Sequence, residues 1–377
     1  MQDVLQELLV GAIALNVKHI LMWCVGLLLM YLAIAKDYEP LLLMPIGFGA
    51  ILTNIPFSSA VGEHGPLTIL LKAGILNEMF PVLIFIAIGA MCDFAPLLRN
   101  PFFMVFGAAA QFGIFATIIV AAMIGFPLNE AAAVGIIGAA DGPTTIYVAN
   151  KFAKELLGPL SVAAYSYMSL VPVIMPPVIK ALTTTEERKI RMPYLEGAKI
   201  SKEALIAFPV VVTLIAGIIA PISVALIGFL MFGNLLRVCG VVERLSRSAQ
   251  NELANLVTLL LGITIGSTMT AEGFLNLKTL LIMGLGLVAF IFDTAGGVLL
   301  AKLLNVFRKQ KINPMLGAAG ISAFPMAGRV VAKMALAEDK NNYIIMQAIG
   351  ANVSGQIGSI IAGGVVLAVV GAMLGIR

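Results

Sequence analysis

An aspartate at position 141 lies in the apolar stretch GIIGAADGPTTIYVAN, where Gly138, Gly142 and Pro143 surround it. Glycine permits unusual backbone angles and proline removes a hydrogen-bond donor, so this spacing predicts a broken helix. A break frees backbone carbonyls and amides, and a carboxylate beside them makes an oxygen-rich pocket that suits Na⁺ or a proton. The alternative is that Asp141 only caps the half-helix that follows the break.

A second interrupted segment, NPMLGAAGISAFPMAGR, covers residues 313–329 and contains Asn313, Ser322 and Arg329. The guanidinium of Arg329 lies between apolar neighbours and therefore needs a counter-anion or water. Its candidate partners are Asp141 and the carboxylate of a substrate, which a guanidinium binds through two parallel hydrogen bonds.

The segment ANVSGQIGS (351–359) adds polar groups near the C-terminus of the chain. In a helix, Asn352, Gln356 and Ser359 share one face through the i, i+4, i+7 spacing. Amides and small residues of this kind also hold membrane helices together without binding a ligand, and that alternative stays open for them.

Other ionisable residues lie within apolar runs. Tyr167 precedes a proline-rich stretch and could donate a proton inside a cavity, although a tyrosine in a span can also be an interface anchor, as can Tyr165. Asp293 is another candidate embedded acid. Asp93 and Glu272 lie near the ends of apolar runs, and we expect them at the membrane interface.

The composition indicates the environment in which these groups work. Of the 377 residues, 60% are hydrophobic and 12% are charged, and the mean hydropathy is +1.02. A soluble domain carries about 25% charged residues. A soluble enzyme, a disordered chain and a nucleic-acid-binding protein are therefore excluded, and a multi-pass protein of the cell (inner) membrane remains. The three cysteines and two histidines show no metal-ligand spacing.

Uncharged stretches that approach or exceed the roughly 20 residues of a membrane-spanning helix recur along the chain. We expect an all-α fold with about ten to twelve embedded segments, some of them half-helices. The stretches lie at 20–35, 79–92, 100–129, 156–179, 204–232, 253–271, 279–292 and 341–376.

The sequence also predicts a division of the chain. Residues 1–19 are expected to include a short interfacial helix, 20–182 a first membrane repeat, 183–203 a linker, and 204–377 a second repeat. The linker and the loop 302–311 are rich in Lys and Arg, which predicts a cytoplasmic position for both.

Two matches between the halves support an internal duplication. IAIGAM (86–91) resembles ITIGST (263–268), and GAADGPTTIYVA (138–149) resembles GISAFPMAGRVVA (320–332), both at a separation of about 180 residues. Repeats of this kind are typical of secondary transporters, whose binding sites lie near the membrane midplane where the repeats meet. We therefore expect two inverted repeats that form a transporter-like core and scaffold.

Four segments together resemble the β subunits of the sodium-pumping, biotin-dependent decarboxylases, a family that acts on oxaloacetate, methylmalonyl-CoA, glutaconyl-CoA or malonate. The segments are GAADGPTTIYVANKFA, YSYMSLVPVIMPPVIKALTT, INPMLGAAGISAFPMAGRVVAK and GANVSGQIGS. The resemblance extends over roughly residues 15–376, and the chain length favours the acyl-CoA branch of the family.

The resemblance implies a mechanism. A separate biotin carrier would bring carboxybiotin to the cytoplasmic face, where its decomposition to biotin and CO₂ consumes a proton while Na⁺ moves outward. It also implies partners: a carboxyltransferase subunit, a small γ or δ membrane subunit, and further copies of the chain in a trimer. No cofactor would be attached covalently to this chain.

The resemblance assigns roles to particular residues. Asp141 would be the central site for the cation and the proton, with Tyr167 and Arg329 as its catalytic partners. Arg329 and Ser322 would contact the carboxybiotin. The Na⁺ ligands would be Asp141, Asn313, Gly317, Ser322, Asn352 and Ser359.

These assignments give a coupling hypothesis. Na⁺ and H⁺ compete for the same oxygens of Asp141, so Na⁺ bound by Asp141 and Asn352 would displace a proton toward Tyr167 and the carboxybiotin. Arg329 would hold the carboxylate or stabilise the neighbouring phenolate.

Two other classes of protein fit the same residues. One is a secondary Na⁺-coupled carboxylate transporter or Na⁺/H⁺ antiporter that breaks no bond. The other is a scaffold subunit whose polar residues only hold helices together.

Overall fold

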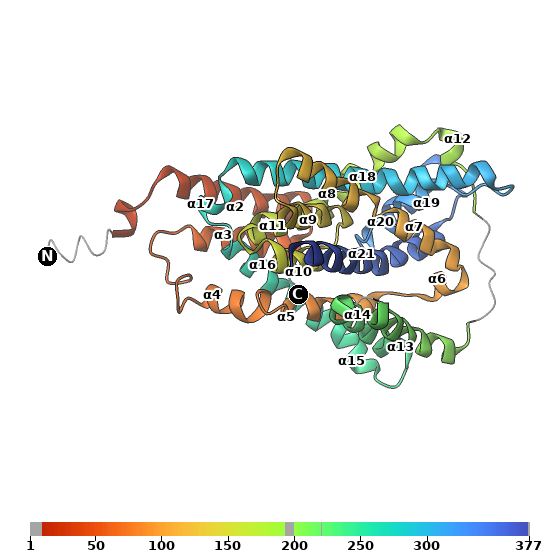
Figure 1. The fold of residues 1–377 in the computed structure, drawn as a ribbon, viewed down its shortest axis with the longest axis horizontal. Helices are drawn as coiled ribbons and strands as arrows, with labels where there is room; N and C mark the ends of the chain where they lie inside the picture. Colours follow the sequence, from red (N-terminus) through yellow and green to blue (C-terminus); the bar gives the residue numbers. More distant parts are fainter. Residues whose placement is uncertain (1–9, 193–199, 220, 376–377) are drawn as a thin grey trace.

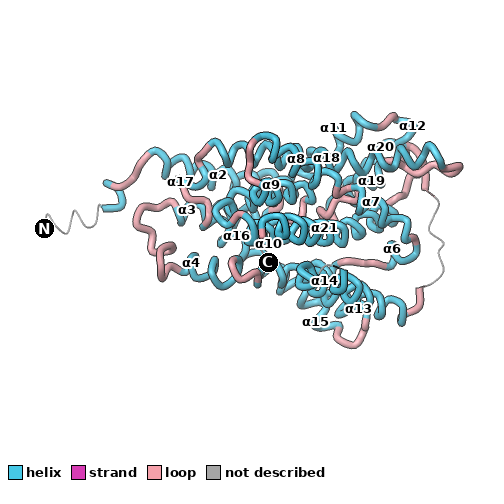
Figure 2. Tube along the Cα trace, in the orientation of Figure 1, coloured by secondary structure: helices cyan, strands magenta, loops and turns pink. Residues whose placement is uncertain are grey.

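The computed structural model describes residues 10–192, 200–219 and 221–375. Throughout these ranges the chain forms helices joined by loops and turns, with no strand, as the tube in Figure 2 shows. An all-α membrane fold is therefore confirmed. The predicted N-terminal interfacial helix lies largely outside the described residues, of which 10–13 form a helical turn ahead of the first long helix.

The helices fall into two sets on either side of the short α12 (Thr185–Arg188). The first set is α2 (Val17–Lys36), α3 (Pro40–Thr53), α4 (Pro66–Leu70), α5 (Met79–Met91), α6 (Ala95–Arg99), α7 (Met104–Ala109), α8 (Phe112–Ile124), α9 (Leu128–Gly135), α10 (Gly142–Phe152) and α11 (Leu157–Leu182). The second set is α13 (Lys202–Ile219), α14 (Val224–Val238), α15 (Glu243–Ser248), α16 (Ala254–Ser267), α17 (Ala271–Phe274), α18 (Leu277–Phe307), α19 (Met315–Ala318), α20 (Met326–Glu338) and α21 (Ile345–Leu374).

Short 3₁₀ or π-helical turns continue or precede several of these helices. They are η1 (Leu71–Ile75), η2 (Pro101–Phe103), η3 (Ile136–Ala139), η4 (Lys154–Leu156), η5 (Pro221–Ser223) and η6 (Ala249–Leu253).

Within the described residues, five helices are long and apolar enough to cross a membrane, and two bent pairs bring the number to seven. Of these pairs, α4–η1 with α5 bends by 62°, and the pair formed by η4 and α11 bends by 67° between Met168 and Val171. Pro172 directly follows this second bend, and proline is a usual cause of such kinks because its ring clashes with the carbonyl four residues earlier. The shorter apolar helices, 40–53 and 128–139, account for part of the difference from the ten to twelve predicted segments, which included half-helices.

Two closely similar helix crossings join the halves of the chain. Helix α3 packs on α16, and α14 packs on α5 in the same way. At each crossing glycines allow the backbones to touch, Gly49 and Gly266 at the first, Gly89 and Gly233 at the second. A Cβ at any of these four positions would overlap the carbonyl of the facing helix. Gly89 and Gly266 are the glycines that the repeated motifs align, so the packing supports the proposed duplication.

Two helices are broken inside the bundle. Helix α9 continues as η3, after which Ala140 takes a left-handed conformation (φ 51°) and Asp141 caps the N-terminus of α10. In the second set, α19 ends at Ala318 and α20 begins at Met326. Both breaks lie where the sequence placed them, and they position the polar groups described below.

The start of the linker is fastened to the second half of the chain. Arg188 forms an ion pair with Glu338 at the end of α20 (Nε to Oε1, 2.6 Å), Arg191 pairs with Asp339, and Lys302 of α18 pairs with Glu187. In Figure 1, α12 and the end of α18 accordingly lie together at the right, opposite the N-terminal end of α2. The linker start and the end of α18 are thus on one side of the molecule.

Replacing Gly89 by Ala should destabilise the protein, because the added methyl group would overlap the carbonyl oxygen of Leu230. Such overpacking costs about 1–3 kcal/mol. Gly284 is the matched control: it also lies in an apolar helix, but no atom lies within 4 Å of the position that an added methyl group would occupy. Thermal unfolding in detergent should show a lower Tm for Gly89→Ala and little change for Gly284→Ala. Equal Tm values would contradict the proposed close crossing.

The attachment of α12 should weaken only in acid. Partial burial opposes ionisation of Glu187, but hydrogen bonds from Thr184 and the Lys302 charge outweigh it and lower its pKa, while Arg191 lowers the pKa of Asp339. A lowered pKa keeps a carboxyl ionised, so its stabilisation is complete above the ordinary carboxyl range and is lost as the pH falls through the lowered pKa. Hydrogen exchange of the α12 amides, corrected for intrinsic rates, should remain slow from pH 7 to 5 and accelerate below.

Glu187→Gln should accelerate this exchange at pH 7, because it removes the ion pair to Lys302. The neighbouring Glu186→Gln is the matched control, since the Glu186 side chain is 87% exposed and lies 3.9 Å from its partner Lys189. Loss of protection already between pH 7 and 5, or equal effects of the two variants, would refute the role of these pairs.

Candidate cation site where two broken helices meet

Asp141 is buried, with 3% of its surface exposed, and is the N-cap residue that immediately precedes α10. Its Oδ1 accepts a hydrogen bond from the Thr144 amide (3.2 Å), and its Oδ2 accepts from the Thr144 hydroxyl (2.7 Å) and the Ser359 hydroxyl (2.8 Å). The aspartate therefore does cap α10, as the simpler interpretation predicted. It also binds a residue 218 positions away in α21, which a cap alone does not require.

The second break touches the first. The Ser322 amide donates to the Ala139 carbonyl (3.3 Å), which joins the loop between α19 and α20 to the end of η3. The Ser322 hydroxyl donates to the Gly355 carbonyl of α21 (3.2 Å). These contacts place backbone groups freed from both broken helices in one small region of the bundle.

Helix α21 lies along both breaks and contacts each of them. The Asn352 side-chain amide donates to the Ile321 carbonyl (2.6 Å), and that of Gln356 donates to the Ser322 carbonyl. Ser359, one turn further, donates to Asp141. The three side chains thus share the face that their spacing predicted, and this face joins the carboxylate of the first half to the open carbonyls of the second.

Two amide oxygens on this face of α21 have no partner among the described residues. They are Oδ1 of Asn352 and Oε1 of Gln356, and both residues are at most 2% exposed. A buried oxygen acceptor without a donor is destabilising by about 1–3 kcal/mol, so such atoms usually receive a ligand, an ion or a water. Like the carboxylate of Asp141, they are oxygen atoms, the ligand type that hard cations prefer.

A transition-metal centre is not supported here. The described residues contain no group of three or more His, Cys, Asp or Glu side chains that could hold a metal ion. Carboxylate, hydroxyl and amide oxygens beside unwound backbone are instead typical of Na⁺ sites in transporters.

Tyr165, more than Tyr167, faces the break. The ring of Tyr165 lies against Gly142, where a Cβ would overlap it, and its buried hydroxyl has no described partner. The Tyr167 ring packs near Gly286 of α18, and its hydroxyl donates to the Met283 carbonyl. The sequence favoured Tyr167, because it precedes the proline-rich stretch and because the family resemblance assigned the role to it. No pattern in this continuously apolar helix showed which tyrosine faces the break.

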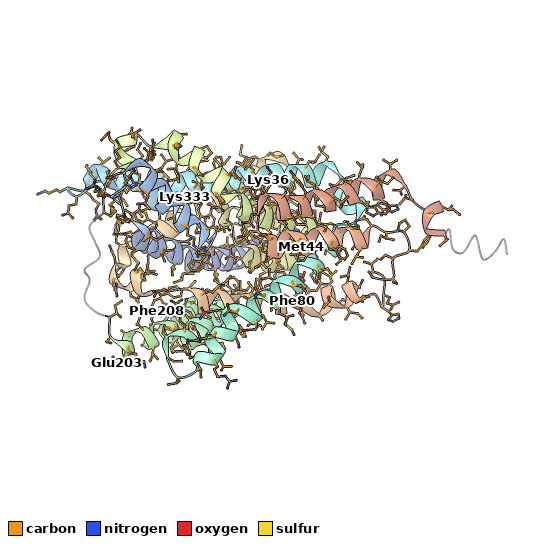
Figure 3. The ribbon with its side chains drawn as sticks, turned by 180° about the vertical axis from the view of Figure 1, so that it is seen from behind. Lys36, Met44, Phe80, Glu203, Phe208 and Lys333 are labelled. Atoms are coloured by element: carbon orange, nitrogen blue, oxygen red, sulfur yellow. The ribbon has the colours of Figure 1, made fainter. Side chains whose placement is uncertain are left out.

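Arg329 lies apart from this cluster. Its side chain is exposed, and it forms no ion pair or hydrogen bond with Asp141 or any other described residue. Lys333, one turn later on α20, is exposed on the same face, toward the end of the molecule that carries α12 in Figure 3. The structure therefore places Arg329 on the surface and separates it from Asp141, one of the two partners that the sequence suggested for it.

Asn313 and Gly317 are also placed elsewhere. The Asn313 side chain is fully buried and donates to the carbonyls of Arg188 (2.8 Å) and Ile190 (2.9 Å) at the start of the linker. Gly317 and Gly297 lie back to back, each without room for a Cβ because of the other's carbonyl. Of the candidate ligands, the structure thus brings together Asp141, Ser322, Asn352 and Ser359.

Two contributors were not singled out from the sequence. Thr144 donates twice to Asp141, and the signal for it was present, since a threonine three residues after an N-cap aspartate is well placed to bond it. Gln356 was noted only for the helix face it shares, and its contact with the second break depends on a loop path that the sequence does not specify.

The chain is similar to known proteins over nearly its whole length. Residues 18–370 match the family model described as the Na⁺-transporting oxaloacetate decarboxylase beta subunit. The methylmalonyl-CoA decarboxylase subunit beta of Propionigenium modestum is 49% identical, covering 96% of this chain and 97% of the relative. The glutaconyl-CoA decarboxylase subunit beta of Acidaminococcus fermentans is also 49% identical, covering 96% of each chain.

The oxaloacetate decarboxylase beta chain of Klebsiella pneumoniae is 46% identical, covering 96% of this chain and 98% of that one. Its alignment needs 424 positions, more than this chain has residues, so the relative carries insertions. With a family model matched over nearly its whole length and relatives of this similarity, the chain belongs to the beta subunits of the Na⁺-transporting decarboxylases.

Proposed function

We propose that this chain binds Na⁺ at Asp141 and moves it across the membrane while carboxybiotin, delivered by a separate biotin carrier, is decarboxylated. The observation that supports this most directly is the oxygen set at the meeting of the two breaks. Asp141, Ser359 and the two unpartnered amide oxygens of Asn352 and Gln356 come from both halves of the chain. Family membership gives the activity its chemical class.

The carboxylate is the group that couples the ion to the chemistry. Na⁺ and H⁺ occupy the same oxygens of Asp141, so binding of Na⁺ releases a proton from a protonated carboxyl. Decarboxylation consumes that proton: carboxybiotin and H⁺ give biotin and CO₂. Moving one charge against 100 mV requires about 2.3 kcal/mol, which the decarboxylation would supply.

Each proposed ligand has a stated role. Asp141 provides the charge, and the hydroxyls of Ser359 and Thr144 orient it. Asn352 and Gln356 hold the carbonyls of the second break with their amide groups and offer their oxygens to Na⁺. Ser322 fixes the contact between the breaks, and Tyr165 and Tyr167 remain candidates for the proton path.

Arg329 is proposed to receive the anionic headgroup of carboxybiotin. Its exposure on α20, with Lys333 one turn away, suits a ligand that arrives from outside the chain better than a partner inside it. A guanidinium can bind a carboxylate through two parallel hydrogen bonds.

The same proposal covers the location of the chain and its partner subunits. The chain is a multi-pass membrane protein and, like its relatives, one subunit of a larger decarboxylase. We place it in the cell (inner) membrane with the linker 183–203 and the loop 302–311 in the cytoplasm. Its partners would be the biotin carrier, a carboxyltransferase, a small γ or δ subunit and further copies in a trimer, with an acyl-CoA as the preferred substrate class of the complex.

Asp141→Asn should reduce Na⁺-dependent decarboxylation by about 100-fold or more, because removing one partner of a buried charge pair, here Asp141 with its bound Na⁺, costs about 3–5 kcal/mol.

Ser359→Ala should raise the Na⁺ concentration for half-maximal activity roughly tenfold, since a hydrogen bond to a charged group contributes about 1.5–3 kcal/mol. Ser354→Ala is the matched control on the same helix, as its hydroxyl bonds the Phe103 carbonyl instead. Activity would be scored as CO₂ release together with ²²Na⁺ uptake into vesicles.

Full Na⁺-dependent decarboxylation by Asp141→Asn would defeat the proposal. Transport of Na⁺ by a preparation without any biotinylated protein would instead favour the secondary carrier.

Asn313→Ala and Asn352→Ala should separate a structural amide from a Na⁺ ligand. The first removes two hydrogen bonds to the linker and should lower the Tm while leaving the half-saturating Na⁺ concentration within about twofold. The second removes an oxygen of the proposed site and should raise that concentration severalfold. An equal increase in both variants would show that Asn313 acts on Na⁺ binding.

A further inference from the structure

A second acidic side chain lies inside the bundle and has no role in the site described above. Asp293 of α18 is fully buried (0% exposed), and neither of its carboxylate oxygens forms a hydrogen bond with a described residue. An ionised carboxylate in such a place is costly unless it is paired, so a buried acid without a partner is expected to bind a proton or a cation.

The immediate neighbours of Asp293 are backbone segments of the first half. Its Oδ1 lies 2.5 Å from the position that a Cβ of Gly113 would occupy, and its Oδ2 lies 2.7 Å from the corresponding position at Gly138. The backbone amides of Gly113 and Ile114 face the carboxylate, without the alignment of a hydrogen bond. Glycine is therefore required on both sides, and the carboxylate is enclosed by α8 and η3.

This environment distinguishes Asp293 from Asp141. Hydroxyl groups and unpartnered amide oxygens lie around Asp141, and they can replace the water shell of Na⁺. The polar groups that face Asp293 are N–H donors. Their positive ends repel a cation and partly offset the free-energy cost of burying the ionised carboxylate. A carboxyl in such a place can exchange a proton but lacks the oxygen ligands of a Na⁺ site.

Asp293 also contacts a residue that lies close to Asp141 along the chain. Gly138, which it contacts, precedes Asp141 by three residues of η3 and the break. On α18, Gly286 lies two turns earlier on the same face and contacts the Tyr167 ring. Other ionisable groups on α18 and on the helices packed against it lie at other levels or form other contacts: Tyr165 and Lys180 of α11, Glu130 of α9 paired with Lys278, and Lys302 paired with Glu187.

We propose that Asp293 is a proton-binding carboxyl that does not bind sodium, and that it receives the hydrogen ion which Na⁺ displaces from Asp141. This inference rests on the proposed function. In the step, the O–H bond on Asp141 breaks as Na⁺ takes its oxygens, and an O–H bond forms on an oxygen of Asp293. The proton thereby stays inside the protein for the later decarboxylation. At any time only one of the two carboxylates, Asp141 or Asp293, is without a bound proton or Na⁺.

Sodium-induced infrared difference spectra of the whole decarboxylase complex test this directly. Adding Na⁺ at constant ionic strength, with K⁺ as the reference ion, should remove the band of one protonated carboxyl and create another. Asp293→Asn should abolish the new band and keep the loss, whereas Asp141→Asn should abolish both. Thr294→Val, a change at the next residue of α18, should keep both bands. A spectrum of Asp293→Asn identical to that of the unchanged protein would overturn the proposal.

A second measurement needs no variant. Dicyclohexylcarbodiimide, an apolar reagent that modifies protonated carboxyls, should label Asp141 far more than Asp293 in the absence of Na⁺, as located by mass spectrometry. Na⁺ should reduce labelling of Asp141 at least fivefold and increase that of Asp293. A decrease of labelling at both aspartates would make Asp293 a sodium site. If instead Asp141→Asn kept its coupling and both bands, the proposed function would fail on its own.

Discussion

Water is absent from the hydrocarbon core of a membrane, so every backbone group freed by a broken helix must find its partner within the protein. Here the two breaks satisfy each other in part, through the Ser322 amide and the Ala139 carbonyl, and α21 supplies two more donors with Asn352 and Gln356. Because each amide group uses its N–H for a carbonyl, its oxygen is left over. The same requirement that closes the breaks therefore creates the oxygen atoms that a cation can use.

The frame around this region depends on close contact between backbones. Gly89 and Gly233 at one crossing, and Gly49 and Gly266 at the other, leave no space for side chains between the helices. Since lipid tails are as apolar as the helix surfaces, association in a membrane relies on packing of this kind more than on the hydrophobic effect. The two crossings hold the halves of the chain against each other, so that residues 218 positions apart, Asp141 and Ser359, can bond.

Much of the site was predictable, because a costly residue in an apolar stretch and the spacing of one helix face are both visible in the sequence. The reason given for the glycines was only partly right. Ala140, and neither Gly138 nor Gly142, takes the left-handed conformation, while the two glycines make room for Asp293 and Tyr165. The exposure of Arg329 depends on how the half-helix α20 is rotated after the preceding loop. The bonds from Asn313 to the linker depend on how the chain folds back over more than 120 residues. No local sequence pattern specifies either of them.

The two breaks align in sequence, yet Ala323 occupies the position that Asp141 holds in the first. A chain with two similar breaks thus carries an acid at only one of them. A perfectly symmetric pair would offer the same site from either side of the membrane and would have no preferred direction. Because the carboxylate is present at one break only, the site differs when it is approached from the two sides of the membrane, which is a precondition for moving ions in one direction.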